Sequence, residues 1–138
     1  MKYPATFTED KDGGFVVTFR DIPEAITQGD TEEEAMAMAE DVLLDSIDWY
    51  LEQKKAVPAP SQAQAGDRLV ELPVSVTAKV MLLNEMLAQN VRPVDLSRKM
   101  GVRSQDVTRI LNLRHNTKID TVSAAFKALG KSIEIRVS

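Results

Sequence analysis

Side chains suited to binding nucleic acid are concentrated between residues 103 and 118 of this 138-residue chain. Glutamine can pair bidentately with adenine and arginine with guanine, while further basic side chains neutralise phosphates. Gln105 and Arg109 are four residues apart, so a helix would place them on one face. The residues expected on a DNA-facing surface are Arg103, Ser104, Gln105, Thr108, Arg109, Asn112, Arg114 and Lys118.

Two further groups raise the question of catalysis. Asp10, Asp12 and Asp21 invite a two-metal nuclease, which needs several carboxylates converging on ions about 4 Å apart. Asp10 and Asp12, however, fall in a predicted hairpin turn, where acidic residues are common because turns are solvated. His115 is the single histidine and has no acidic neighbour in the sequence to orient it as a general base. The chain lacks cysteine, which excludes thiolate chemistry and leaves only His115 and carboxylates as zinc ligands. From these observations together we expect no enzymatic activity, no metal site and no cofactor.

The polar cluster belongs to a segment, Pro93 to Leu111, whose pattern predicts two short helices joined by a tight turn. Ser97 is small where the helices would cross, and Gly101 tolerates the positive φ that the turn needs. Ser104 is the expected N-cap of the second helix. Four apolar residues are spaced to bury the contact between the helices: Leu96, Met100, Val107 and Ile110. This spacing is typical of a helix-turn-helix that reads a major groove, and a structural helix pair without a DNA ligand is the alternative.

The first half of the chain has the pattern of a small sheet and one long helix. Short runs of β-branched and aromatic residues, a Gly-rich turn and a capping box at Thr31 and Glu34 mark these elements. The predicted strands and helix are Tyr3–Thr8, Phe15–Phe19, Ala25–Gln28, a helix over Glu32–Gln53 and a returning strand over Leu69–Leu72. One apolar stripe of the helix, which includes Met38 and Trp49, is expected to cover the sheet. Residues 56–67 are predicted to form a loop without periodicity.

The second half is predicted to be helical, with one strand at its end. Helices are expected over Val76–Gln89 and Asp120–Leu129, on either side of the paired helices. The last residues alternate in polarity as a strand does, and a lone strand must find a partner for its N–H and C=O groups. Two copies pairing antiparallel about Ile135 would set Glu134 opposite Arg136, which favours a homodimer or a higher even oligomer. The expected dimerisation residues are Ile133, Glu134, Ile135, Arg136 and Val137.

Charge divides the chain in the same way. Residues 1–66 carry 5 basic and 14 acidic side chains, a net charge of −9, whereas residues 67–138 carry 12 and 7, a net charge of +5. The basic half can neutralise phosphates, and the acidic half would be repelled by the same DNA. We therefore predict an α+β protein with two domains, residues 1–74 and 75–138, of which only the second binds nucleic acid.

The segment DIPEAITQGDTEEEA, residues 21–35, which follows a hairpin strand beginning GGF, resembles the signature of HicB antitoxins. The C-terminal helix-turn-helix is similar to that of the DNA-binding branch of this family. The resemblance implies a type II toxin-antitoxin system in which a β-β-β-α-β, partial ribonuclease H-like domain neutralises a small basic mRNA-cleaving HicA-like toxin. It also implies that an all-α, phage-repressor-like domain represses the chain's own operon at its operator. Because this domain ends in the predicted C-terminal strand and would form a two-fold dimer through it, we expect that operator to be an inverted repeat.

A row of acidic residues on the long helix is the candidate toxin-binding surface. The spacings of seven, four, three and four place Glu34, Asp41, Asp45, Asp48 and Glu52 on one face. Such a stripe can mimic phosphates and attract a basic RNA-binding toxin, and a merely solvated face is the alternative.

A second function is kept open at this point. It is a transcriptional regulator whose N-terminal domain senses a ligand or only oligomerises, without a toxin partner. The sequence contains no apolar run that would span a bilayer and no secretion signal at its start, so we expect a cytoplasmic protein without a membrane partner.

Overall fold

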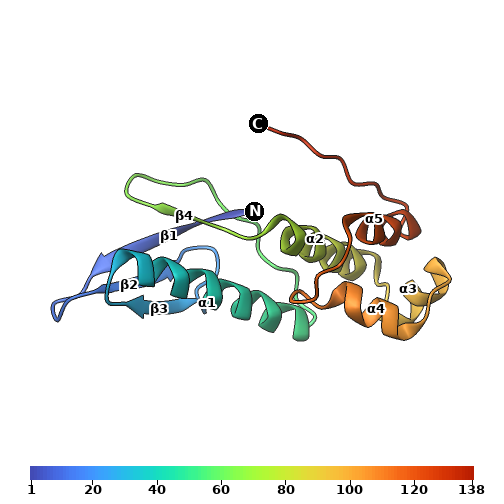
Figure 1. Ribbon diagram of the computed structural model, residues 1–138, viewed down its shortest axis with the longest axis horizontal. Coiled ribbons are helices and arrows are strands. Elements are labelled where there is room, and N and C mark those ends of the chain that lie inside the picture. The colour runs from blue at the N-terminus through green and yellow to red at the C-terminus, as the bar shows by residue number, and fades with distance from the viewer. The chain divides into compact units, whose positions relative to one another are not determined.

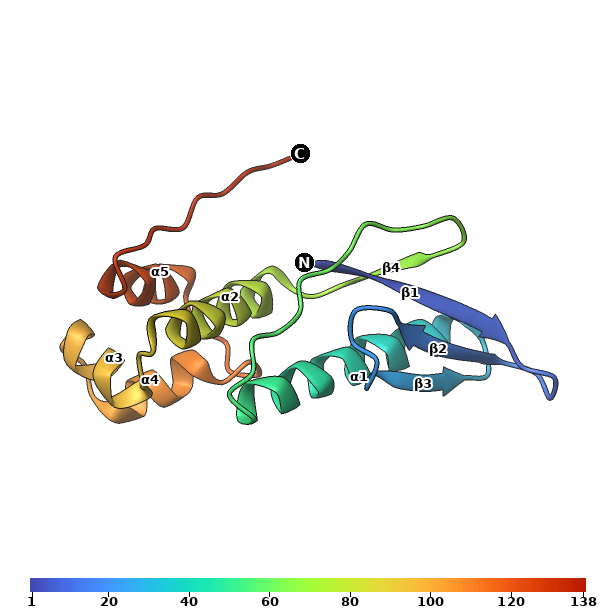
Figure 2. The same cartoon turned by 180° about the vertical axis from the view of Figure 1, so that it is seen from behind.

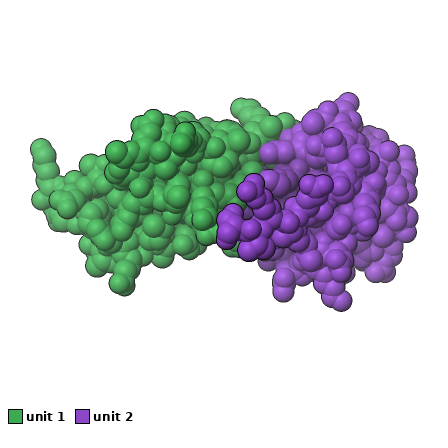
Figure 3. All heavy atoms as spheres, turned by 90° about the horizontal axis from the view of Figure 1, so that it is seen from above, with its two compact units in different colours: residues 1–73 green, residues 74–138 purple.

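The computed structural model describes residues 1–138 and has the predicted α+β class, with one four-stranded antiparallel sheet and five helices (Figure 1). The chain forms two compact units, residues 1–73 and 74–138 (Figure 3). No helix is long and apolar enough to cross a membrane.

Unit 1 is built on a sheet with the strand order β3-β2-β1-β4. The strands are β1 (Lys2–Glu9), β2 (Phe15–Phe19), β3 (Ile26–Gly29) and β4 (Arg68–Glu71), and all four predicted strands are confirmed to within one residue at each end. The turn between β1 and β2 passes through Gly13 and Gly14 with φ of 91° and 79°. A Cβ atom at Gly14 would lie 2.6 Å from the backbone oxygen of Gly29, so the hairpin needs glycine there to pack beside the end of β3.

Helix α1 (Glu32–Glu52) lies across one face of this sheet, in front of it in Figure 1 and behind it in Figure 2. Its predicted capping box is present, because the Glu34 N–H donates to Thr31 Oγ1 at 3.1 Å and the Glu34 carboxylate accepts from the Asp30 N–H at 3.2 Å. The residues of α1 that are buried are Ala35, Ala39, Leu43, Ser46 and Ile47.

The predicted apolar stripe of α1 is wrong at two positions. Met38 is 41% exposed and Trp49 is 42% exposed, so neither belongs to the core. At 3.6 residues per turn, both lie at the margin of the face that is centred on Ala39, Leu43 and Ser46. The sheet is covered by that face, and the two large side chains at its edge are left partly in solvent.

Unit 2 consists of α2 (Val74–Gln89), α3 (Pro93–Met100), α4 (Ser104–Leu111) and α5 (Ile119–Ala128). These bounds confirm the predicted helices to within two residues. The core joins all four helices and contains Leu82, Met86, Leu96, Val107, Ile110, Val122, Ala125, Phe126 and Leu129.

The turn between α3 and α4 follows the sequence prediction at Gly101, which has the left-handed values φ 69° and ψ 34°. Ser97 does more than leave space, because its hydroxyl donates to the Val102 carbonyl at 2.7 Å. The predicted N-cap is wrong: α4 begins at Ser104, and Arg103 is its N-cap. The Asp106 carboxylate, three residues on, accepts from the Arg103 N–H at 3.3 Å and thereby satisfies a donor at the start of the helix.

The predicted strand over residues 132–137 is absent from the chain. Ile133 packs partly against the core of unit 2, whereas Ile135 and Val137 are 79% and 90% exposed. The segment runs away from α5 in both views (Figures 1 and 2). A strand exists only through hydrogen bonds to a neighbour, and none is present within the chain for these residues. Pairing with a second copy stays a prediction.

Candidate functional site

The polar and apolar residues of α4 lie on opposite sides of the helix. Val107 and Ile110 are 1% and 2% exposed, and on the opposite side Gln105 and Arg109 are exposed. Ser104 and Thr108 are exposed on the same side, as are Arg103, Asn112, Arg114 and Lys118 around the helix ends. The structure therefore brings the residues expected to bind DNA to the surface of one helix and the segment that follows it.

Internal contacts restrain several of these side chains. Asp106 lies between two of the arginines, with a carboxylate oxygen 3.5 Å from Arg103 Nε and the other 3.9 Å from Arg109 Nη1. The Thr108 hydroxyl turns back to the Ser104 carbonyl at 3.0 Å, which leaves its methyl group outward. Both arginines remain largely exposed, so a phosphate or base edge can compete with Asp106 for them.

A pocket of about 370 Å³ is lined by residues of α4, of the turn before it and of the segment that leads into α5, among them Arg109, His115 and Lys118. The His115 ring contacts a hydroxyl rather than a carboxylate, with Nδ1 3.0 Å from Thr117 Oγ1. Apolar side chains and Asp106 also line this pocket, so its lining is mixed rather than basic. The hydroxyl beside the His115 ring is not the carboxylate that would orient the ring as a general base.

A buried lysine behind α4 was missed by the sequence analysis. Lys79 of α2 is 1% exposed, and its ammonium group contacts the end of α4. The available signal was its position in the helical pattern, since it falls between Val76 and Val80 on the apolar face of α2. A charged residue in such a place needs a specific set of hydrogen-bond acceptors.

The five acidic residues of the candidate toxin-binding surface lie on the side of α1 away from the sheet. Asp41, Asp45 and Glu52 are exposed, Asp48 is half-buried, and Glu34 is exposed while it takes part in the capping box. We call these five residues the acidic stripe. The half-exposed side chains of Met38 and Trp49 follow one margin of the stripe.

The ring of Trp49 is held in place by its neighbours. It makes an edge-to-face contact with Tyr50 at 5.3 Å between centroids, and the Lys55 ammonium lies 5.4 Å from its centroid. The Tyr50 hydroxyl in turn donates to the Glu24 carboxylate at 2.7 Å. An exposed aromatic side chain held in this way loses little conformational entropy when a partner packs against it.

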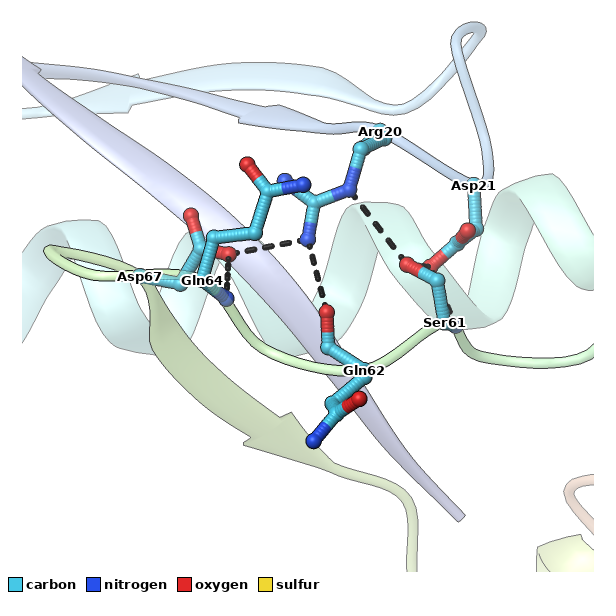
Figure 4. Close-up of polar contacts among 6 residues, drawn as sticks. All are labelled: Arg20, Asp21, Ser61, Gln62, Gln64 and Asp67. Atoms are coloured by element: carbon cyan, nitrogen blue, oxygen red, sulfur yellow. Dashed lines mark hydrogen bonds and ion pairs between the residues drawn. The ribbon is translucent and has the colours of Figure 1, made fainter.

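The loop before β4 is fixed by charged residues, as Figure 4 shows. The Arg20 guanidinium donates to the Asp67 carboxylate at 2.9 Å and to Ser61 Oγ and the Gln62 carbonyl, both at 3.3 Å. Asp21 accepts from both the N–H and the hydroxyl of Ser61, at 2.9 and 3.0 Å. The loop that showed no periodicity is thus anchored to the segment after β2.

These contacts also set the ionisation of the residues involved. The hydrogen bond from Arg20 lowers the pKa of Asp67, with a further contribution from the Gln64 N–H. Burial raises the pKa of Tyr3 to about 12, and its hydroxyl donates to the Pro58 carbonyl at 2.7 Å. Asp21 is occupied by Ser61, and no group of three His, Asp or Glu side chains is close enough together to hold a metal ion.

Comparison with known proteins identifies the family. Residues 2–81 match the model of the HicB-like antitoxins of bacterial toxin-antitoxin systems. The chain is 46% identical over 135 residues to antitoxin HicB of Escherichia coli, covering 98% of each protein. It is 47% identical over 135 residues to antitoxin HicB 2 of Photorhabdus laumondii, covering 98% of this chain and 95% of that one. It is 32% identical over 126 residues to antitoxin HicB of Pseudomonas fluorescens, covering 91% and 86%. The chain therefore belongs to the HicB-like antitoxin family of bacterial toxin-antitoxin systems.

Proposed function

We propose that this antitoxin neutralises a small, basic, mRNA-cleaving HicA-like toxin through unit 1 and represses its own operon through unit 2. The observation that carries the proposal is the match to antitoxins HicB over nearly the whole chain, which includes both units. The order of elements along unit 1, β-β-β-α-β, supports the partial ribonuclease H-like fold that the resemblance implies.

The acidic stripe is the proposed toxin surface. A toxin that binds RNA through basic side chains is attracted by a row of carboxylates, which accelerates association at low salt. Affinity and specificity need apolar contacts as well, and the exposed side chains of Met38 and Trp49 can supply them at the margin of the stripe.

Helices α3 and α4 are the proposed helix-turn-helix, with α4 in the major groove. The matching positions of a phage-repressor type motif put Ser104, Gln105 and Arg109 against base edges. Gln105 is suited to adenine and Arg109 to guanine, and each bidentate pair gives roughly 1 to 3 kcal/mol of discrimination. Arg103, Arg114 and Lys118 are better placed for phosphates.

Two copies of unit 2 are proposed to pair through residues 132–137 about Ile135. The exposure of Ile135 and Val137 in the single chain supports this, because the alternating apolar side chains lack a neighbour. A two-fold dimer directs two recognition helices to two half-sites, so the operator is expected to be an inverted repeat.

Co-expression with a small basic protein encoded next to this chain tests the proposal. We expect the two proteins to copurify, mRNA cleavage by the basic protein to stop, and the purified chain to bind the DNA upstream of its own gene. A chain that binds this DNA but neither binds nor silences the basic protein would instead be a regulator with a ligand-sensing or oligomerising N-terminal unit. Silencing without any preference for the upstream DNA would remove the repressor half of the proposal.

A further inference from the structure

Lys79 is the only charged residue that is buried as a whole in this chain, with 1% of its surface exposed. Its ammonium group has no carboxylate partner and is held by neutral oxygen atoms. It donates to the His115 carbonyl at 2.6 Å, the Asn112 carbonyl at 2.7 Å and Thr117 Oγ1 at 2.8 Å, and it lies 3.3 Å from the Arg109 carbonyl. An ammonium group has three N–H donors, so the three short contacts satisfy it completely.

Burial of the Lys79 ammonium group also has a cost in free energy. Removal of an ammonium group from water is unfavourable by several kcal/mol unless hydrogen bonds replace its hydration shell. Burial accordingly lowers the pKa of Lys79. An apolar residue would fill the same place on α2 without that penalty, which indicates that the charge itself serves a purpose.

The oxygen atoms around Lys79 belong to the end of α4 and the segment that leaves it. Arg109 lies in the last turn of α4, Asn112 is its C-cap, and His115 and Thr117 follow. The last carbonyl groups of a helix have no partners within the helix and carry the negative end of its dipole. A buried ammonium group is matched to this site in both hydrogen bonding and charge.

Helix α3 shows how a helix in the same unit ends without such help. At its end Gly101 adopts left-handed values, and the N–H groups of Gly101 and Val102 both donate to the Ser97 carbonyl. Asn112 of α4 has instead the extended values φ −80° and ψ 113°, and its own N–H is the one backbone donor of the cap that returns to the helix, at the Arg109 carbonyl. The Thr117 hydroxyl makes a longer contact with the same carbonyl, at 3.4 Å. The end of α4 thus depends on a side chain from α2.

We propose that Lys79 is a positioning residue, which fixes the end of α4 against α2 and thereby sets where Gln105 and Arg109 are presented. The apolar contacts of Val107 and Ile110 decide which face of α4 points inward. Such contacts are not directional and permit small rotations and shifts, whereas hydrogen bonds to the carbonyls at the helix end do not. The inference deepens the proposed function of α4 in DNA reading and rests on it for its functional consequence.

Lys79→Met tests the proposal in the full-length chain, since methionine is also unbranched, is only one atom shorter than lysine and lacks the N–H donors. Without DNA, hydrogen exchange should become faster at the amides of Thr108 to Leu111 of α4 and remain near its original rate at those of Ser97 to Met100 of α3. With DNA, the preference for the duplex upstream of the gene over a scrambled duplex should fall roughly tenfold, as expected for one displaced bidentate contact. Affinity for the scrambled duplex and its salt dependence should change little, because a buried Lys79 contacts no phosphate.

Lys127→Met is the matched control, because it removes one exposed lysine from α5 of the same unit. It should leave the exchange of α4 unchanged. Thr117→Val removes one of the four oxygen atoms and keeps the volume, so it should produce the same pattern to a smaller degree, and it serves if Lys79→Met does not fold.

Equal acceleration of exchange in α3 and α4 by both Lys79→Met and Thr117→Val would overturn the proposal and reduce Lys79 to general support of the core. An unchanged DNA preference combined with faster exchange in α4 would also overturn it. If the original chain shows no preference for the upstream duplex, the repressor function fails, while the exchange experiment still decides whether Lys79 holds α4.

Discussion

Units 1 and 2 differ in charge, architecture and use of polar contacts. Unit 1 carries 6 basic and 16 acidic residues, a net charge of −10, and unit 2 carries 11 and 5, a net charge of +6. Proposed partners of opposite charge, a basic toxin and an acidic DNA, would therefore each be attracted by only one unit. The comparison teaches that the overall charge of −4 describes neither binding surface.

The units also stabilise their irregular segments differently. In unit 1 the loop before β4 is held at the surface by Arg20, Asp21 and Asp67. The Arg20 side chain is 34% exposed, so solvent partly screens its contact with Asp67 and the contribution to stability is modest. In unit 2 the end of α4 is held from inside by Lys79, where removal of one partner leaves buried groups unsatisfied. Loss of one charged contact should therefore cost less stability in unit 1 than in unit 2.

Deletion of residues 131–138 should give the largest difference between the activities of the two units. We expect unit 1 to stay folded and to neutralise the toxin, and we expect dimers of the chain to disappear. Operator affinity should then approach that for nonspecific DNA, a loss of about 1,000-fold or more, because one module makes too few contacts. Analytical ultracentrifugation and DNA binding provide the measurement, and a dimer that persists after the deletion would place the two-fold contact elsewhere.

The double variant Gln105→Ala and Arg109→Ala should have the next largest effect. Loss of two bidentate contacts should lower operator preference by roughly 100-fold while toxin neutralisation remains. Arg114→Ala is the control for a phosphate contact and should weaken binding to all duplexes about equally. Competition between operator and scrambled duplexes measures the preference, and a double variant that still prefers the operator would show that other residues read the bases.

Reversal of Asp41, Asp45 and Asp48 to lysine should impair the proposed activity of unit 1 and spare that of unit 2. We expect toxin association to slow by roughly 10- to 100-fold at low salt, mRNA cleavage to return, and operator binding to be unchanged. Reversal of Glu9, Glu40 and Glu71 to lysine changes the charge of unit 1 equally outside the stripe and should have a much smaller effect. Equal effects of the two triple variants on the association rate, in folded proteins, would mean that only net charge matters.

The smallest expected effect is a loss of stability of unit 1 in acid, through the contact between Arg20 and Asp67. The pKa of Asp67 is lowered by Arg20, so the unfolded chain takes up this proton more readily than the folded one. The stability that this contact contributes is therefore complete above the ordinary carboxyl pKa of 3.8 and is lost as the pH falls through the lowered value. Arg20→Met should lower the melting temperature of unit 1 by a few degrees at neutral pH and by less in strong acid. A difference that is the same at both pH values would exclude the ion pair as its source.

Most of the secondary structure and the family followed from local sequence patterns. Alternation and the 3.6-residue period depend on neighbouring residues, so the four strands of unit 1 and the five helices were predictable to within two residues. The positive φ at Gly101 and the capping box at Thr31 follow equally from local chemistry. Residues 21–35 indicated the family before any fold was known.

The partners of individual polar and apolar side chains became known only from the packing of distant elements. The contact from Lys79 to Asn112 spans 33 residues, and that from Arg20 to Asp67 spans 47. The sequence likewise did not reveal that Met38 and Trp49 lie outside the core, that Asp106 caps α4, or that residues 132–137 form no strand within the chain. Local patterns specify which face of an element is apolar, but the partner of a side chain depends on how distant elements pack together.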